Sequence, residues 1–141
     1  MITLGKPLRA EDLADGRRRR LLEPHTIVVT VKGKALTITV PVGFVSDGAS
    51  VPWGLWNLAR PWNEFGPAAV VHDYLYERGP SYLPRVTADW IFGEHMKAIC
   101  PTLPGNWLKR AWRAVRRRAM YRAVQIGGWW SWNEHRAREK E

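Results

Sequence analysis

The chain has 141 residues and a mass of 16.2 kDa, which fits a single domain spanning residues 1–141. Hydrophobic residues make up 45% of it and charged residues 25%, so the composition excludes a wholly disordered protein. There is one cysteine, Cys100, and neither a secretory signal nor a stretch of about 18 apolar residues that could span a membrane. These features predict a protein of a reducing compartment, with no signal peptide and no transmembrane helix.

The net charge of +9 is unevenly distributed along the chain. Residues 1–25 contain six Lys or Arg and four Asp or Glu, residues 26–104 contain six of each kind, and residues 105–141 contain ten and three. The excess of positive charge therefore belongs to the C-terminal third. A partner attracted by this charge is expected to contact residues 106–141, not the body of the domain.

The first third of the chain predicts the β-structure. Residues 1–25 show little periodicity and predict an irregular segment or an edge strand. Two β-branched runs, TIVVTV and ALTITV, flank a Lys-Gly-Lys turn and predict an antiparallel hairpin over residues 26–41. Residues 41–52 combine Gly, Pro and Ser around Asp47, which is typical of a sharply bent loop of specific shape.

The middle of the chain predicts a Trp-rich connector and two helices. The connector covers residues 53–62, with room for one short helical turn. Pro67 suits the first turn of a helix that ends at Gly79. Thr87 is a suitable N-cap for a second helix, which ends before Pro101. The turn between these helices is short, so we expect them to be spatial neighbours.

A third helix is expected from Asn106, a good N-cap, to Gly127, a good stop, followed by a Trp-rich and charged tail over residues 129–141. Apolar residues at helical spacing form a stripe on this helix, and basic residues crowd the rest of its surface. The stripe consists of Leu108, Ala111, Trp112, Val115 and Ala119. The predicted fold class is thus α+β, with a small antiparallel β-sheet packed on about three α-helices.

The cationic helix and its tail permit three interpretations. The stripe could pack on the core while the arginines form a solvated face. The helix could instead lie on an anionic lipid surface, with its tryptophans at the level of the headgroups, or bind the phosphate backbone of DNA. The residues expected to contact lipid or nucleic acid are Arg110, Arg113, Arg117, Trp129 and Trp130.

Three ionisable residues lie among apolar neighbours on the first two predicted helices, namely His72, Asp73 and Asp89. Burial of such groups is costly unless they pair or bind a metal, so they predict one common site. If the helices pack antiparallel, Asp89 can hold one imidazole nitrogen of His72 while the other faces water, as a general base requires. Asp73 is turned about 100° from His72 and would face the loop that carries Asp47, whose oxygens could bind a hard cation.

The same residues also fit a purely structural role. His72 could be a hydrogen-bonded core histidine, and Asp73 could pair with Arg78 or Arg85. Asp89 could be favoured simply by the dipole at the start of its helix. The sequence contains no Cys-x-x-Cys pair, P-loop or Gly-x-Ser-x-Gly elbow, so no nucleotide cofactor is expected.

Four segments occur in order along the chain: VPVGFVSDGASVP, AAVVHDYLYERG, TADWIFGEHM and AMYRAVQIGG. This series resembles the phage and prophage family known as domain of unknown function 1353, over roughly residues 26–128. The resemblance implies a bacteriophage or integrated prophage as the source. It therefore implies a location in the host bacterial cytoplasm or in the phage virion, and it implies nothing about activity.

The segments AAVVHDYLY and ADWIFGEHM are also similar to the helix pair of secreted and viral phospholipases A2, where a His-Asp dipeptide, a following Tyr and a partner-helix Asp form the catalytic network. This resemblance implies that His72 is the base that activates water and that Asp89 orients it. It further implies that Asp73 is a calcium ligand and Tyr76 a hydrogen-bonding support. A Trp-rich interval precedes His72 here, where those enzymes have a Gly-rich calcium loop, and the GFVSDGAS loop with Asp47 is the candidate replacement.

Two functions of different classes follow from these observations. The leading expectation is a phage or prophage protein with a phospholipase A2-like site, acting as a calcium-dependent esterase. The alternative is a non-catalytic virion or accessory protein, whose basic C-terminal helix binds DNA, membrane or another phage protein.

Overall fold

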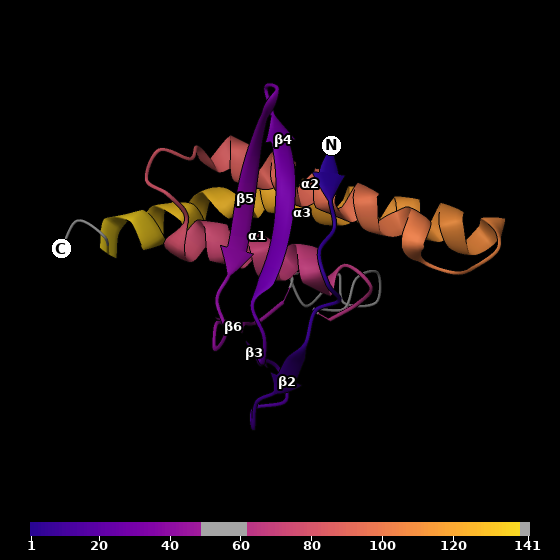
Figure 1. Cartoon of the computed structure of the whole chain (residues 1–141), viewed down its shortest axis with the longest axis horizontal. Coiled ribbons are helices and arrows are strands. Elements are labelled where there is room, and N and C mark those ends of the chain that lie inside the picture. Colours follow the sequence, from indigo (N-terminus) through magenta and orange to yellow (C-terminus); the bar gives the residue numbers. More distant parts are fainter. Residues whose placement is uncertain (49–61, 139–141) are drawn as a thin grey trace.

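The structure, a computed structural model, describes residues 1–48 and 62–138 (Figure 1). The predicted connector over residues 53–62 lies, apart from Trp62, outside the described residues. The described part contains two three-stranded antiparallel sheets and three α-helices, which confirms the predicted α+β fold class. Within that part, no helix combines the length and the apolar character needed to cross a membrane.

The larger sheet contains the predicted hairpin. Its strands are β1 (Ile2–Thr3), β4 (His25–Val31) and β5 (Lys34–Val40), in the order β1-β4-β5. The tight turn between β4 and β5 has positive φ at Lys32 and Gly33, as a two-residue hairpin connection requires. Strand β5 forms one edge of this sheet, and the short β1 forms the other.

The smaller sheet was not predicted. It consists of β2 (Ala10–Asp12), β3 (Arg19–Leu21) and β6 (Val45–Ser46), in the order β2-β3-β6. Its first two strands carry charged side chains that pair across the ladder, with Arg19 Nε 2.6 Å from Asp12 Oδ1. Such strands lack the alternation of apolar and polar residues that identifies a half-buried strand, so the sequence predicts only an irregular segment or an edge strand for residues 1–25.

The helices are α1 (Gly66–Arg78), α2 (Arg85–Ile99) and α3 (Trp107–Arg138), with a 3-10 turn, η2 (Cys100–Thr102), after α2. Two predicted boundaries are wrong. Helix α2 has Pro84 as its N-cap, so Thr87 lies inside the first turn. Helix α3 continues through Gly127 to Arg138. Asn106 caps α3 as expected, because its Oδ1 accepts a hydrogen bond of 3.1 Å from the Lys109 amide.

The elements form three layers (Figure 1). The sheet β1-β4-β5 covers one side of the α1–α2 pair, with β5 against α1 and β1 against α2. Helix α3 packs on both α1 and α2, across the side of the pair away from this sheet. The core between sheet and helices includes Leu21, Ile27, Val29, Ile38, Val40, Val70, Val71, Leu75 and Ile91. A second cluster joins the helices through Phe65, Ala68, Ala69, Phe92, Met96, Ile99 and Met120.

The face of helix α3 that packs on α1 and α2 is not the face that carries the apolar stripe. The residues that pack inward include Met120, Val124 and Gly128, at spacings of four. The stripe points outward instead, with Leu108 57%, Trp112 47% and Val115 49% exposed. The interpretation in which the stripe packs on the core is therefore wrong. The inner face fits the other helices, because Met120, Tyr121 and Val124 pack into the second cluster and Gly128 permits a close approach to Tyr76.

A buried histidine pair links the sheet to α2. His25 at the start of β4 and His95 on α2 are 6% and 1% exposed, and their rings stack 6.2 Å apart. Among the described residues, His25 Nε2 and His95 Nδ1 have no hydrogen-bond partner. Burial lowers the pKa of both side chains, and for His95, where the neighbouring His25 adds to the effect, the pKa falls to about 4. Both are therefore neutral in the folded protein near pH 7.

This pair should make the fold sensitive to acid. The pKa of His95 is about 4 in the folded chain and about 6.5 in the unfolded chain, so the unfolded state binds more protons between these values. We expect stability to fall by about 3 kcal/mol as the pH drops through this interval. Urea unfolding at about pH 7.5 and about pH 4.5 measures the loss, and His95→Leu should flatten it. An unchanged pH dependence in that variant would contradict the assignment to His95.

Candidate functional site

The packing of α1 on α2 brings His72 and Asp89 together. His72 lies in the middle of α1 and Asp89 in the second turn of α2, and the two helices are adjacent across the short turn that connects them. His72 Nε2 is 3.0 Å from Asp89 Oδ1, and the side chains are only 10% and 5% exposed. An ionised Asp89 accepts the Nε2–H, which leaves Nδ1 as the basic nitrogen of the ring.

Two further side chains fix the Asp89 carboxylate. The Tyr76 hydroxyl donates to Oδ1 at 2.5 Å, and Arg85 Nη1 donates to Oδ2 at 3.0 Å. Tyr76 follows His72 by one helical turn, and Arg85 precedes Asp89 by one turn, so helical spacing aims all four groups at one point. Burial raises the pKa of Tyr76, and its hydrogen bond to Asp89 raises it further, so the phenol remains a donor.

Helix α3 closes this network from the outside. Gly128 is buried so close to Tyr76 that a Cβ atom at this position would lie 2.4 Å from the phenol oxygen. Trp132, one turn later, packs edge-on against the Tyr76 ring at a centroid distance of 5.1 Å. Arg85 Nη1 also donates to the Gln125 carbonyl at 3.4 Å. The continuation of α3 beyond Gly127 therefore covers the His72–Asp89 pair.

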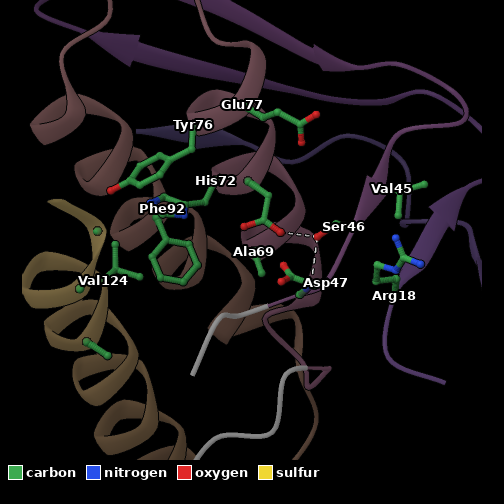
Figure 2. Close-up of a pocket in the computed structure, with 15 residues that line it drawn as sticks. Arg18, Val45, Ser46, Asp47, Ala69, His72, Tyr76, Glu77, Phe92 and Val124 are labelled. Atoms are coloured by element: carbon green, nitrogen blue, oxygen red, sulfur yellow. Dashed lines mark hydrogen bonds between the residues drawn. The ribbon is translucent and has the colours of Figure 1, made fainter. Parts of the chain in front are cut away.

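A cavity of about 460 Å³ borders His72 (Figure 2). Its walls come from four parts of the fold: Arg18 just before β3, strand β6 with the loop that follows it, the inner faces of α1 and α2, and the middle of α3. In Figure 2, Ser46 and Asp47 lie to the right of His72 and Val124 of α3 to its left. Phe92 of α2 contacts the His72 ring, with centroids 4.9 Å apart. The cavity is thus part polar and part apolar.

Asp73 lines the same cavity on its polar side. The Ser46 hydroxyl donates to Asp73 Oδ2 at 2.5 Å and accepts the Gly48 amide at 3.0 Å. The pKa of Asp73 lies well above its usual range, chiefly because of burial, and the Asp47 carboxyl beside it and Glu77 raise it further. The hydrogen bond from Ser46 opposes this shift. Asp73 therefore favours the protonated form unless a positive charge comes close to it.

The oxygen atoms of Asp73 and Asp47 are the type of ligand that calcium takes. A cation bound to them would offset the charge repulsion and the burial that raise the Asp73 pKa. Within residues 1–48 and 62–138, no group of three or more His, Cys, Asp or Glu side chains could hold a metal ion. A hard cation at this point would find two carboxylates among the described residues, and backbone carbonyls or water would have to complete its coordination.

The structure identifies the partners of Asp89 and of the two arginines that could have paired with Asp73. Arg85 binds Asp89, and Arg78 lies 3.5 Å from Glu77, so the pairing of Asp73 with either arginine is wrong. Asp89 is the fifth residue of α2, beyond the first turn where the helix dipole favours a carboxylate. Three contributors were missed in the sequence: Arg85, Ser46 and Gly128. Only Arg85 had a signal, namely its spacing of four from Asp89.

The predicted contact residues of the basic helix have different environments. Arg110 is exposed, whereas Arg113 is half-buried and donates to the carbonyls of Leu103 and Pro104. Arg117 is also half-buried, and within the described residues its Nε has no hydrogen-bond partner. Trp129 and Trp130 belong to α3, but their side chains lie outside what the structure describes.

Comparison with known proteins identifies the family. The profile of the family described as "Protein of unknown function (DUF1353)" matches residues 21–124, which include His72, Asp73, Tyr76 and Asp89. No curated protein and no solved structure matches the chain. The match covers most of the chain and agrees with the resemblance found in its four ordered motifs. The chain therefore belongs to the family of domain of unknown function 1353.

Proposed function

We propose that the chain is a calcium-dependent esterase of the phospholipase A2 type, encoded by a phage or prophage. The observation that carries this proposal is the His72 imidazole, which Asp89 holds at 3.0 Å beside a cavity of about 460 Å³ that Asp73 also lines. A histidine oriented by a buried carboxylate and bordering a cavity is the arrangement of a general base. The second carboxylate, one residue away along α1, supplies an oxygen-rich position next to it.

His72 would move the proton in two steps. Its Nδ1 accepts a proton from a water molecule in the cavity while the water oxygen bonds to the ester carbonyl carbon. Asp89 stabilises the imidazolium that forms, since its carboxylate accepts the Nε2–H. The imidazolium then returns the proton to the leaving alcohol oxygen as the ester C–O bond breaks. Tyr76 and Arg85 keep Asp89 in place throughout, because their hydrogen bonds occupy both of its oxygens.

Asp73 and Asp47 would hold the calcium ion, and the ion, when bound, would stabilise the negative charge that develops on the carbonyl oxygen. Ser46 fixes the orientation of Asp73 through its hydroxyl, which leaves the second carboxylate oxygen, Oδ1, for a ligand. The apolar part of the cavity, with Phe92 and Val124, suits an acyl chain.

The direct test is release of fatty acid from phospholipid in mixed micelles, with calcium and with a chelator. We expect hydrolysis that requires calcium. If neither this substrate nor a panel of short-chain esters is hydrolysed in the presence of calcium, the proposal is wrong.

Calcium should also stabilise the fold. The ion relieves the repulsion between Asp73 and Asp47, so its binding to the native state raises the melting temperature in a concentration-dependent manner. Asp73→Asn should abolish the rise, and the exposed Asp12→Asn should not affect it. Differential scanning calorimetry with calcium and with magnesium measures both effects. An equal rise in wild type and Asp73→Asn would place the ion elsewhere.

A specific observation also favours the non-catalytic alternative, a virion or accessory protein. The hydrogen bond from Ser46 to Asp73 ties the loop after β6 to α1, which is what a purely structural polar network would do. This alternative requires co-purification with phage particles and loss of assembly on deletion of residues 128–141. A soluble monomer that is absent from virions would exclude it.

A further inference from the structure

We propose that the outer face of α3 is a docking surface for anionic lipid bilayers, an inference that rests on the proposed function because it states where that activity meets its substrate. The surface consists of the outward stripe of α3 and the basic residues beside it. The large apolar side chains on it are Trp107, Leu108, Trp112, Val115 and Ile126, and the exposed basic ones are Lys109, Arg118 and Arg122.

The stripe has the geometry of a helix that lies in a membrane interface. Leu108, Trp112 and Val115 follow one another at helical spacing, and Ile126 lies in the same row three turns later, beyond Ala119 and Arg122. This row lies opposite the face that packs on α1 and α2. They are 47% to 81% exposed, which is unusual for such large apolar side chains in one row. Because α1 and α2 hold the helix rigidly by its other face, no folding cost accompanies its contact with a bilayer.

The charge of the surface selects an anionic partner. From residue 105 to residue 133 the sequence contains seven Lys or Arg and no Asp or Glu. Exposed Lys109 lies on one side of the stripe and Arg118 on the other, so they can reach headgroup phosphates while the stripe enters the acyl boundary. Arg122 lies in the row of the stripe, and its long side chain can extend to the same phosphates. A second copy of the chain would bring the same positive charges together, and this disfavours self-association through this face.

The position of apolar residues within the face distinguishes lipid from nucleic acid. A helix that binds phosphate backbones places its basic and polar side chains at the centre of the contact. Here large apolar side chains, Trp112, Val115 and Ile126, dominate the central row, which contains one basic residue, Arg122. Lys109 and Arg118 flank this row. Burial of these side chains against DNA would gain little, whereas burial among acyl chains gains their full transfer free energy.

The docking surface also adjoins the cavity. Ala123 and Gly127 of α3 line the cavity, and both lie on α3 one helical turn or less from Ile126. The helix that carries the stripe therefore also forms one wall of the candidate esterase site.

Binding can be measured separately from hydrolysis. The probe is vesicles of ether-linked phospholipid, which cannot be hydrolysed at an acyl ester, made of phosphatidylglycerol with phosphatidylcholine or of phosphatidylcholine alone. We expect the full chain to co-sediment with the anionic vesicles and to dissociate at high salt. Arg118→Gln with Arg122→Gln should weaken binding roughly 25-fold, since each basic residue contributes about fivefold. The matched control is Lys6→Gln with Lys34→Gln, two exposed residues outside α3.

The apolar stripe has its own variants. Val115→Ser with Ile126→Ser should weaken binding by about tenfold or more, and Val86→Ser, an exposed valine on α2, should have no effect. Binding that resists the stripe variants, or equal binding to both kinds of vesicle, would overturn the proposal. The proposal would also be overturned if the chain bound double-stranded DNA but no vesicles, and if that binding required the arginines and not the apolar stripe. Vesicle binding without fatty-acid release would support the docking surface and contradict the proposed esterase. Hydrolysis of dissolved esters without vesicle binding would support the esterase and contradict the docking surface.

Discussion

Replacement of His72 by glutamine is expected to reduce kcat for ester hydrolysis by about a hundred- to ten-thousandfold, the usual contribution of a general base. The glutamine amide can still donate to Asp89, so the buried carboxylate keeps a partner and the fold should persist. What the variant lacks is a nitrogen that can take the proton from water. Fatty-acid release from mixed micelles measures the loss, and urea unfolding checks the fold.

Asp89→Asn completes this test as a positioning variant. Its amide retains the shape of the carboxyl but cannot accept a hydrogen bond at both atoms, so the imidazole loses its fixed tautomer. We expect a large fall in kcat with little change in KM. Glu94→Gln on the same helix removes a carboxylate outside the network and serves as the control. Wild-type activity in His72→Gln would show that the imidazole is not the base, whatever activity the protein has.

Two adjacent glycines of α3 should respond in opposite ways to alanine. A Cβ atom at Gly128 would lie 2.4 Å from the Tyr76 hydroxyl, so Gly128→Ala must displace the phenol or the helix. We expect a loss of stability of about 1 to 3 kcal/mol, as in other overpacked interiors, together with loss of esterase activity. Gly127→Ala meets no atom within 4 Å and should stabilise α3 by roughly 0.5 to 1 kcal/mol, because alanine is the better helix former.

This pair of variants isolates the contact between α3 and the network. The two proteins have the same composition and differ only in which residue of one helix carries the methyl group. Urea unfolding curves give the difference in stability. Equal stability of Gly128→Ala and Gly127→Ala would contradict the close packing of α3 on Tyr76.

The elements that could be predicted from sequence are those in which local pattern and burial agree. The hairpin β4–β5 alternates buried and exposed residues around a Gly-containing turn, and α1 ends before a proline. The smaller sheet escaped prediction because its charged strands are held by partners distant in sequence, such as Arg19 and Asp12. The orientation of α3 escaped it because hydrophobicity alone does not reveal which face is shaped to fit α1 and α2.

Some residues of the candidate site could be predicted from the sequence and others could not. His72, Tyr76 and Asp89 could be selected in sequence because helical spacing and burial restrict where their side chains can point. The sequence also predicts that Asp73 faces the loop of Asp47, and the pKa of Asp73, which burial raises most, is raised further by the Asp47 carboxyl beside it. Ser46 and Gly128 could not be found, since their roles depend on how a loop and a remote helix approach α1, and no local pattern encodes this.

The position of β5 has a consequence for behaviour in solution. This seven-residue strand forms the border of its sheet, and in the described part of the chain its outer row of amides and carbonyls meets no other strand. Such a border can recruit further strands and seed aggregates. Lys34 begins the strand and a proline, Pro41, directly follows it, so a charge and a missing amide limit strand addition at either end. Loss of both safeguards would convert this border into a template for fibril growth.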